Sequence, residues 1–155
     1  MEKGDSMIVM IIDGQGGGIG AAIIKGLREA GDLNVECWAL GTNSIATSRM
    51  MKAGANRGAT GENAIVQTTR QVDVIIGPIS IVLAHAMMGE VTPKMAEAVA
   101  SSPARKLLLP LSQERIEIVG VCPNPLPHLV EELITKHLKF IPSLNTKPAK
   151  GNHDV

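Results

Sequence analysis

The segment Asp13–Gly20, with the sequence DGQGGGIG, constrains this 155-residue chain more than any other stretch. It follows the continuous apolar run 7–12, whose length and β-branched residues predict a strand buried on both faces. It precedes residues 19–30, whose apolar side chains recur at helical spacing. Four glycines in residues 16–20 exceed what a turn alone needs. The segment therefore predicts a strand–loop–helix unit whose backbone approaches a ligand closely. The alternative is a glycine-rich turn that only closes the unit.

The rest of the chain alternates between strand and helix patterns. Strands are predicted at 33–40, 72–76 and 106–109, a loop at 54–61, and helices at about 44–53, 62–70, 79–88, 93–101 and 127–138. Only about six residues separate the fourth strand from the apolar stretch 116–121, and a parallel crossover needs a dozen or more. That stretch is therefore predicted as an antiparallel edge strand. The order predicts a three-layer, Rossmann-like α/β sandwich with an otherwise parallel sheet.

One domain is expected from the length and composition of the chain. Apolar residues make up 45% and charged residues 19%, which is a globular composition. We expect a single Rossmann-like domain over residues 1–142. Residues 143–155 are polar, show no apolar pattern, and are expected to form a disordered tail.

A ligand site is predicted where the first and third strands end, because α/β sheets bind ligands at the carboxyl ends of their strands. The N-terminus of the first helix there offers N–H donors and a partial positive charge to a phosphate. The expected ligand is a nucleotide, NAD(P) or another phosphorylated small molecule. Its predicted contacts are Asp13, Gly14, Gln15, Gly16, Gly17, Gly18, Ile19, Gly20, Gly41, Thr42, Asn43, Thr60, Asn63, Gly77, Pro78, Ile79 and Ser80.

Several of these residues have a second interpretation. Asp13 could bind a cation or orient a ligand hydroxyl, or it could cap the N–H groups of the loop that follows. Thr60 and Asn63 could contact a ligand or cap the next helix, and Ser80 has the same two alternatives. Asp13 and Glu62 are the candidates for proton transfer. Whether the protein is an enzyme stays open at this point.

Known phosphate motifs fit only in part. A P-loop needs Lys-Ser/Thr after its last glycine, where this chain has two alanines. The pattern Gly14-x-x-x-Gly18-Ile19-Gly20 is similar to that of short-chain dehydrogenases, but the chain contains no Tyr for their Tyr-x-x-x-Lys pair. Dinucleotide sites usually carry an acid at the end of the second strand, and Thr42 and Asn43 stand there instead. A phosphate is thus better supported than a full dinucleotide.

Charge and composition exclude other classes of partner. Fifteen Lys and Arg balance fifteen Asp and Glu, so no nucleic-acid partner is expected. No apolar run reaches the roughly 20 residues that span a bilayer, so no membrane is expected and a cytoplasmic location is favoured. The histidines and the two cysteines lack metal-ligand spacing, which predicts no metal site. Cys37 and Cys122 are expected to be two buried thiols, and the alternative is a single disulfide between them.

The predicted helix 79–88 is apolar almost all round. A helix on a sheet face should show one polar side to water, so this helix predicts a covered surface and favours a homodimer. The same feature supports an alternative function. The protein would then be a non-catalytic ligand sensor or accessory subunit that acts through a homodimer or a protein partner.

Four stretches carry a resemblance to a known family. They are VMIIDGQGGGIG at 9–20, ALGTNSIAT at 39–47, GANRGATGENAI at 54–65 and IGPI at 76–79. The chain resembles a family of small bacterial proteins known only as a domain of unknown function, and the likeness continues more loosely to about residue 135. This resemblance implies a Rossmann-like fold and no mechanism, so function must be argued from the site.

Overall fold

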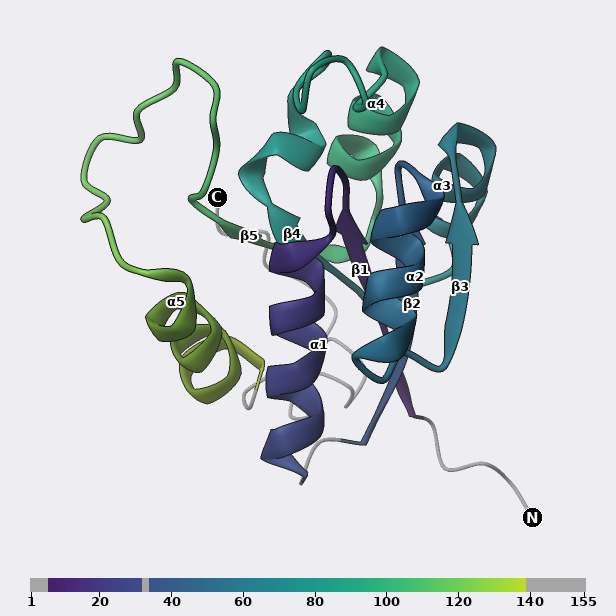
Figure 1. The fold of residues 1–155 in the computed structure, drawn as a ribbon, viewed down its shortest axis with the longest axis vertical. Helices are drawn as coiled ribbons and strands as arrows, with labels where there is room; N and C mark the ends of the chain where they lie inside the picture. Colours follow the sequence, from purple (N-terminus) through teal and green to yellow (C-terminus); the bar gives the residue numbers. More distant parts are fainter. Residues whose placement is uncertain (1–5, 32–33, 139–155) are drawn as a thin grey trace, which may run out of the picture.

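Five parallel strands form the central sheet of the computed structural model, which describes residues 6–31 and 34–138 (Figure 1). The strand order is β3-β2-β1-β4-β5, the order of the first five strands in a Rossmann sheet. β1 is central because its apolar residues suit burial on both faces. The strands are β1 (Met7–Asp13), β2 (Val35–Gly41), β3 (Arg57–Thr60), β4 (Val74–Pro78) and β5 (Arg105–Leu109).

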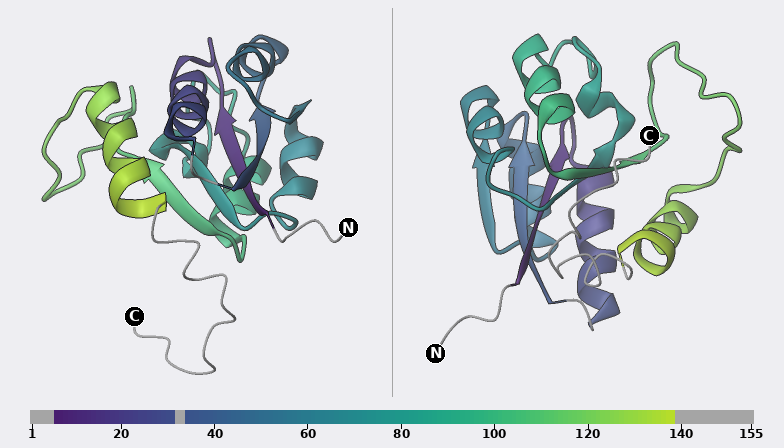
Figure 2. Two further views of the ribbon diagram at one scale, coloured as in Figure 1. Left: turned by 90° about the horizontal axis from the view of Figure 1, so that it is seen from below. Right: turned by 180° about the vertical axis from the view of Figure 1, so that it is seen from behind.

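Helices cover both faces of this sheet, which confirms the three-layer α/β prediction (Figure 2). One face carries α1 (Gly18–Ala30), α2 (Ser44–Lys52), α5 (Leu126–Glu132) and the π-helical turn η2 (Leu133–His137). The other carries α3 (Glu62–Thr68), the 3₁₀ turn η1 (Ile79–Val82) and α4 (Pro93–Ser101).

Alternate residues of β1 supply the two cores, as the two-residue period of a strand requires. Val9 and Ile11 pack with α1 and α5, whereas Met10 and Ile12 pack with α3 and α4. All four side chains are fully buried. The sheet therefore holds the carboxyl ends of its strands rigidly, which is where the loops of interest begin.

The predicted antiparallel edge strand at 116–121 is wrong. No such strand is present in the described part of the chain, and β5 forms the sheet edge beside parallel β4. Pro110 follows β5 directly, and its missing N–H and fixed φ disfavour continued pairing. Residues 110–125 instead run as an exposed loop, with Val119 98% exposed.

The predicted helix 79–88 is also wrong beyond its first turn. Only Ile79–Val82 is helical, and it is a 3₁₀ turn. His85, Met87 and Met88 have positive φ angles, which no α-helix allows. Periodicity cannot distinguish an apolar helix from a buried irregular segment. Since Ala86 and Met87 are buried within the chain itself, an exposed apolar helix no longer argues for a dimer.

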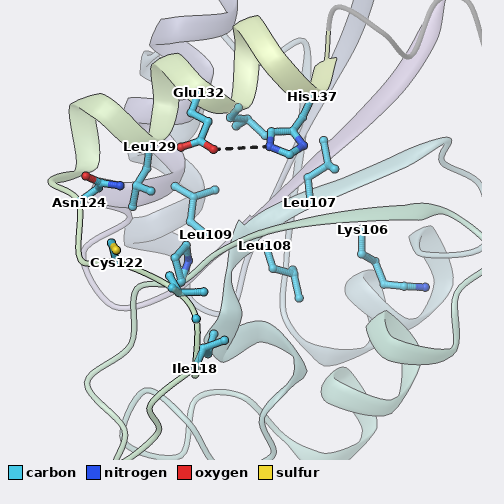
Figure 3. A pocket seen from close by; sticks show the side chains of 14 residues that line it. Lys106, Leu107, Leu108, Leu109, Ile118, Cys122, Asn124, Leu129, Glu132 and His137 are labelled. Atoms are coloured by element: carbon cyan, nitrogen blue, oxygen red, sulfur yellow. Dashed lines mark ion pairs between the residues drawn. The ribbon is translucent and has the colours of Figure 1, made fainter.

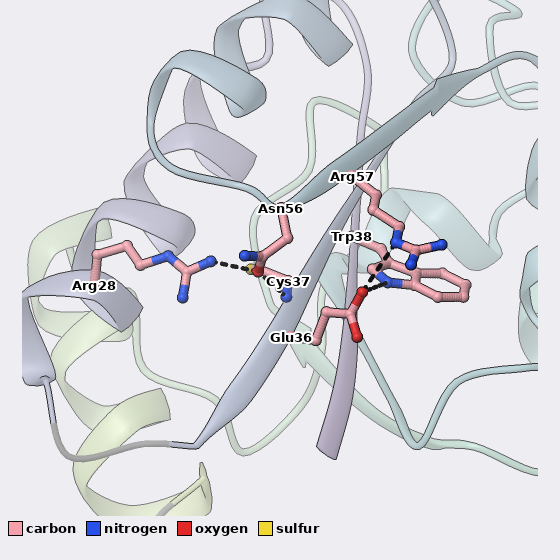
Figure 4. A network of polar contacts seen from close by, with 6 residues as sticks. All are labelled: Arg28, Glu36, Cys37, Trp38, Asn56 and Arg57. Carbon is pink, nitrogen blue, oxygen red and sulfur yellow. Dashed lines mark hydrogen bonds and ion pairs between the residues drawn. The ribbon is translucent and has the colours of Figure 1, made fainter. Parts of the chain in front are cut away.

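Residues 54–61, predicted as a loop, contain the short strand β3. Asn56, the residue before β3, is held in place by hydrogen bonds (Figure 4). Its Oδ1 accepts from the Cys37 N–H at 2.8 Å and from Arg28 Nη2 at 2.6 Å.

Cys37 is buried as expected, but Cys122 is exposed, which corrects the prediction of two buried thiols. The predicted tail at 143–155 lies outside the described residues. Over the described ranges, no helix has the length and apolar character to cross a membrane.

Candidate functional site

The ends of β1 and β4 border a cleft of about 290 Å³ on the carboxyl side of the sheet. This is the point where the strand order reverses, between β1 and β4, and where doubly wound folds bind their ligands. The structure therefore brings the first and third predicted loops together. The cleft is lined by Asp13, Gln15, Ile19, Ser80, Met87, Leu111, Ser112, Gln113 and Glu114.

Packing within the chain explains three of the five glycines in the loop. A Cβ on Gly14 would collide with the side chains of Thr42 and Met87, and one on Gly20 with Met50. Gly17 has φ +73°, and its Cβ would lie 2.7 Å from the backbone of Ala46. These three glycines serve the close packing of the βαβ unit, as the turn interpretation predicts.

Gly16 and Gly18 have no such explanation. Their φ angles are not positive, and a Cβ on either would meet only Arg49, at 3.7 Å and 3.5 Å, which is ordinary contact. Their N–H groups donate to no acceptor within the described residues. The start of α1 and the residue before its N-cap thus present two unused donors beside the Arg49 guanidinium, an arrangement that suits an anion.

Arg49 of α2 was not predicted from the sequence. Its Nη1 donates to the carbonyl oxygen of Gly16 at 3.3 Å, so the guanidinium lies over the glycine loop. An exposed arginine on a helix carries no sequence signal of this role. Its positive charge adds to that of the α1 N-terminus at the same place.

Asp13 is bound into the loop as the capping interpretation predicts. It is 3% exposed, and its two oxygens accept from the N–H groups of Gly14 at 2.8 Å and Gly20 at 2.7 Å. Burial raises the pKa of Asp13, and the nearby charge of Glu90 raises it further, against the hydrogen bonds from the loop N–H groups. Asp13 also lines the cleft, so both of its predicted roles remain compatible with the geometry.

Glu90 is a second residue that sequence reasoning missed. Its Oε1 accepts hydrogen bonds from the Gln15 N–H at 2.9 Å, from Thr42 Oγ1 at 2.7 Å and from Asn43 Nδ2 at 2.7 Å. Burial acts to raise the pKa of Glu90, but the bonds from Thr42, Gln15 and Asn43 together lower it below its ordinary value. The sequence did carry a signal that Glu90 has a specific role, because it is the one charged residue between Asp73 and Lys94.

Other predicted contacts have structural partners or lie elsewhere. Thr60 Oγ1 pairs with Thr47 Oγ1 at 2.7 Å beside β3, while Glu62 and Asn63 begin α3, and none of these lines the cleft. A Cβ on Gly41 would collide with Thr47, and a Cβ on Gly77 would approach the carbonyl oxygen of Ile12. Pro78 and Ile79 join β4 to η1 and place Ser80 in the cleft.

A larger cavity of about 520 Å³ lies between β5, the 118–124 loop and α5 (Figure 3). It contains none of the predicted contacts. Its polar side chains include Glu132 and His137, whose Oε1 and Nε2 atoms are 4.0 Å apart. In the described part of the chain, no three His, Cys, Asp or Glu side chains gather as a metal ion would require.

Comparisons with known proteins identify the family. The family model "Domain of unknown function (DUF3842)" matches residues 8–142. The chain belongs to this family. Among solved structures, a dodecameric FMN-dependent Ubix-like decarboxylase from Escherichia coli O157:H7 is similar over 94% of this chain and 97% of that chain, with 14% identity and a TM-score of 0.45. No curated protein matches the chain in sequence.

Membership of the DUF3842 family confirms the expected family and assigns no activity. The four stretches that carry the resemblance include the glycine loop, the end of β2 and the start of η1. The glycine loop and the start of η1 meet at the cleft, whereas the end of β2 does not line it. The function of this DUF3842 protein has to be argued from the geometry described above.

Proposed function

We propose that this protein binds a phosphorylated small molecule, with its phosphate at the N-terminus of α1 between Gly16, Gly18 and Arg49. The observation that carries the proposal is the pair of glycines that the chain's own packing does not require. Nucleotides and NAD(P) belong to this ligand class. Asp13, Gln15, Ile19 and Ser80 line the adjoining cleft and would contact the rest of the molecule.

The donor set supports this ligand chemistry. The N–H groups of Gly16 and Gly18 are unused among the described residues, and a guanidinium lies beside them. Charge-assisted hydrogen bonds from arginine to phosphate are about twice as strong as neutral ones. Asp13 accepts a hydrogen bond from the Gly20 N–H, so that donor is already used, whereas over the described ranges the N–H groups of Gly16 and Gly18 stay free for the ligand.

Isothermal titration calorimetry tests the proposal with inorganic phosphate, AMP, NADH and ribose 5-phosphate. Arg49→Gln should weaken phosphate-dependent binding about 10- to 100-fold, because a hydrogen bond to a charged group contributes about 1.5–3 kcal/mol. Lys52→Gln is the matched control. It removes one positive charge from the same exposed end of α2, at a residue with no hydrogen bond to the loop.

Equal affinities of the wild type and Arg49→Gln would contradict the proposal, as would the absence of binding to every phosphate compound. The sensor or accessory-subunit alternative uses the same site. It differs only in that the ligand is not consumed, which chromatography of the ligand after prolonged incubation measures.

A further inference from the structure

The β2 side of the site is already occupied by the chain itself. In dinucleotide sites, an acid at the end of β2 holds a ribose hydroxyl. Here the three donors at that place, from Gln15, Thr42 and Asn43, all bind one oxygen of Glu90. These donors are therefore not free to bind a ligand, and Oε1 of Glu90, an oxygen that could accept from a ribose hydroxyl, already accepts all three hydrogen bonds. Gln15, Thr42 and Asn43 thus offer the adenosine half of a dinucleotide none of these three donors.

The β4 side of the site is open to a ligand, because Ser80, just after β4, lines the cleft. Ser80 is 5% exposed, and its hydroxyl has no hydrogen-bond partner among the described residues. It lines the cleft, as do the side chains of Gln15 and Ile19 that flank the glycines of the loop. No fully buried side-chain oxygen or nitrogen among the described residues lacks a hydrogen-bond partner, so the Ser80 hydroxyl is open to the cleft, where a ligand group can bond to it.

The other polar groups of the cleft suit neutral hydroxyls. Ser112 and Gln113 can donate and accept, and the carboxylates of Asp13 and Glu114 accept. Two carboxylates disfavour a second phosphate at this end of the ligand. Glu114 is itself fixed by the Met87 N–H at 3.1 Å, so its charge stays beside the cleft.

None of the described residues that line the cleft has an aromatic ring on which a base could stack. Trp38, the one tryptophan, lies within β2 with the Arg57 guanidinium 5.9 Å from its ring centre (Figure 4). It is not among the residues that line the cleft. The volume of about 290 Å³ is just below the range of about 300–1,000 Å³ usual for ligand pockets. Both facts favour a single small polar group over a nucleobase.

We infer that the ligand is a sugar or polyol carrying one phosphate, and that a dinucleotide is not accepted. The phosphate lies at Gly16 and Gly18 beside Arg49, and the hydroxyls lie in the cleft against Ser80 and Gln113. This inference rests on the proposed function, because it uses the same phosphate site and adds the class of the group attached to it.

Calorimetry of the full chain with four probes tests this inference. We expect ribose 5-phosphate to bind at least about tenfold more tightly than inorganic phosphate, fructose 1,6-bisphosphate or NADH. Ser80→Ala should weaken ribose 5-phosphate binding about 3- to 10-fold, the effect of one neutral hydrogen bond, and leave inorganic phosphate unchanged. Ser101→Ala is the control, since that hydroxyl bonds to the Glu97 carbonyl on α4, away from the cleft.

The measured affinities distinguish a failure of the sugar inference from a failure of the proposed phosphate site. If ribose 5-phosphate and inorganic phosphate bind equally while Arg49→Gln weakens both, the phosphate site stands and the sugar inference is overturned. Tighter binding of NADH than of ribose 5-phosphate also overturns it, as does an unchanged affinity of Ser80→Ala for ribose 5-phosphate. If no phosphate compound binds, the proposed function itself fails.

Discussion

Replacement of Glu90 by alanine should destabilise the fold by about 3 kcal/mol. The carboxylate joins the glycine loop to the end of β2 through three hydrogen bonds, from the Gln15 N–H, the Thr42 hydroxyl and the Asn43 amide. A hydrogen bond to a charged group contributes about 1.5–3 kcal/mol. Glu90 is only partly buried, so water can replace part of this, and we take about 1 kcal/mol for each bond.

Urea unfolding measures this effect as a lower midpoint at an unchanged slope. In a thermal melt the same loss should lower Tm by about 6–12 °C, at about 2–4 °C per kcal/mol for a chain of this size. Glu97→Ala, an exposed acid on α4, is the control and should change stability by less than about 0.5 kcal/mol. A Glu90→Ala protein as stable as this control would refute the role of Glu90 in joining the two loops.

Three further predictions follow from the same geometry. Gly14→Ala should destabilise by about 1–3 kcal/mol in urea unfolding, because its Cβ would overlap the side chains of Thr42 and Met87. In the folded protein one thiol per chain should react with a thiol reagent, since Cys122 is exposed whereas burial raises the pKa of the Cys37 thiol to about 11; two fast thiols would contradict this. The lowered pKa of Glu90 means that its stabilising effect is complete above its ordinary value of 4.5 and is lost as pH falls through the folded-state pKa. The stability difference between wild type and Glu90→Gln should therefore shrink on acidification, and a difference that is constant from pH 7 to about pH 3 would count against it.

Most of the sheet could be predicted because continuous apolar runs identify buried strands. The runs at 7–12, 72–76 and 106–109 correspond to β1, β4 and β5 with shifts of one or two residues. β3 was missed because Arg57–Thr60 is short, and its residues are mostly exposed. It has neither an apolar run nor an alternation, and its pairing with β2 is a tertiary property.

The candidate site, like the sheet, could be predicted from the sequence only in part. The meeting of the first and third loops follows from strand order alone, and the cleft lies there. The contacts of Arg49 and Glu90 could not be predicted, because Arg49 lies 33 residues from its partner Gly16, and Glu90 lies 47 to 75 residues from Asn43, Thr42 and Gln15. Glu90 follows the segment 79–88, which was predicted as a helix, whereas positive φ angles at His85, Met87, Met88 and Gly89 give the chain a different course there, and Glu90 reaches the end of β2.

The most direct test of the phosphate site is the affinity of Gly18→Ala for ribose 5-phosphate. An alanine Cβ fits within the protein, 3.5 Å from Arg49, and replacing this glycine should leave stability unchanged or raise it by up to about 1 kcal/mol. The same Cβ would occupy the space assigned to the phosphate, so binding should fall at least about tenfold while Tm does not decrease. Undiminished affinity in this folded variant would contradict the assignment of the glycine loop as a phosphate site.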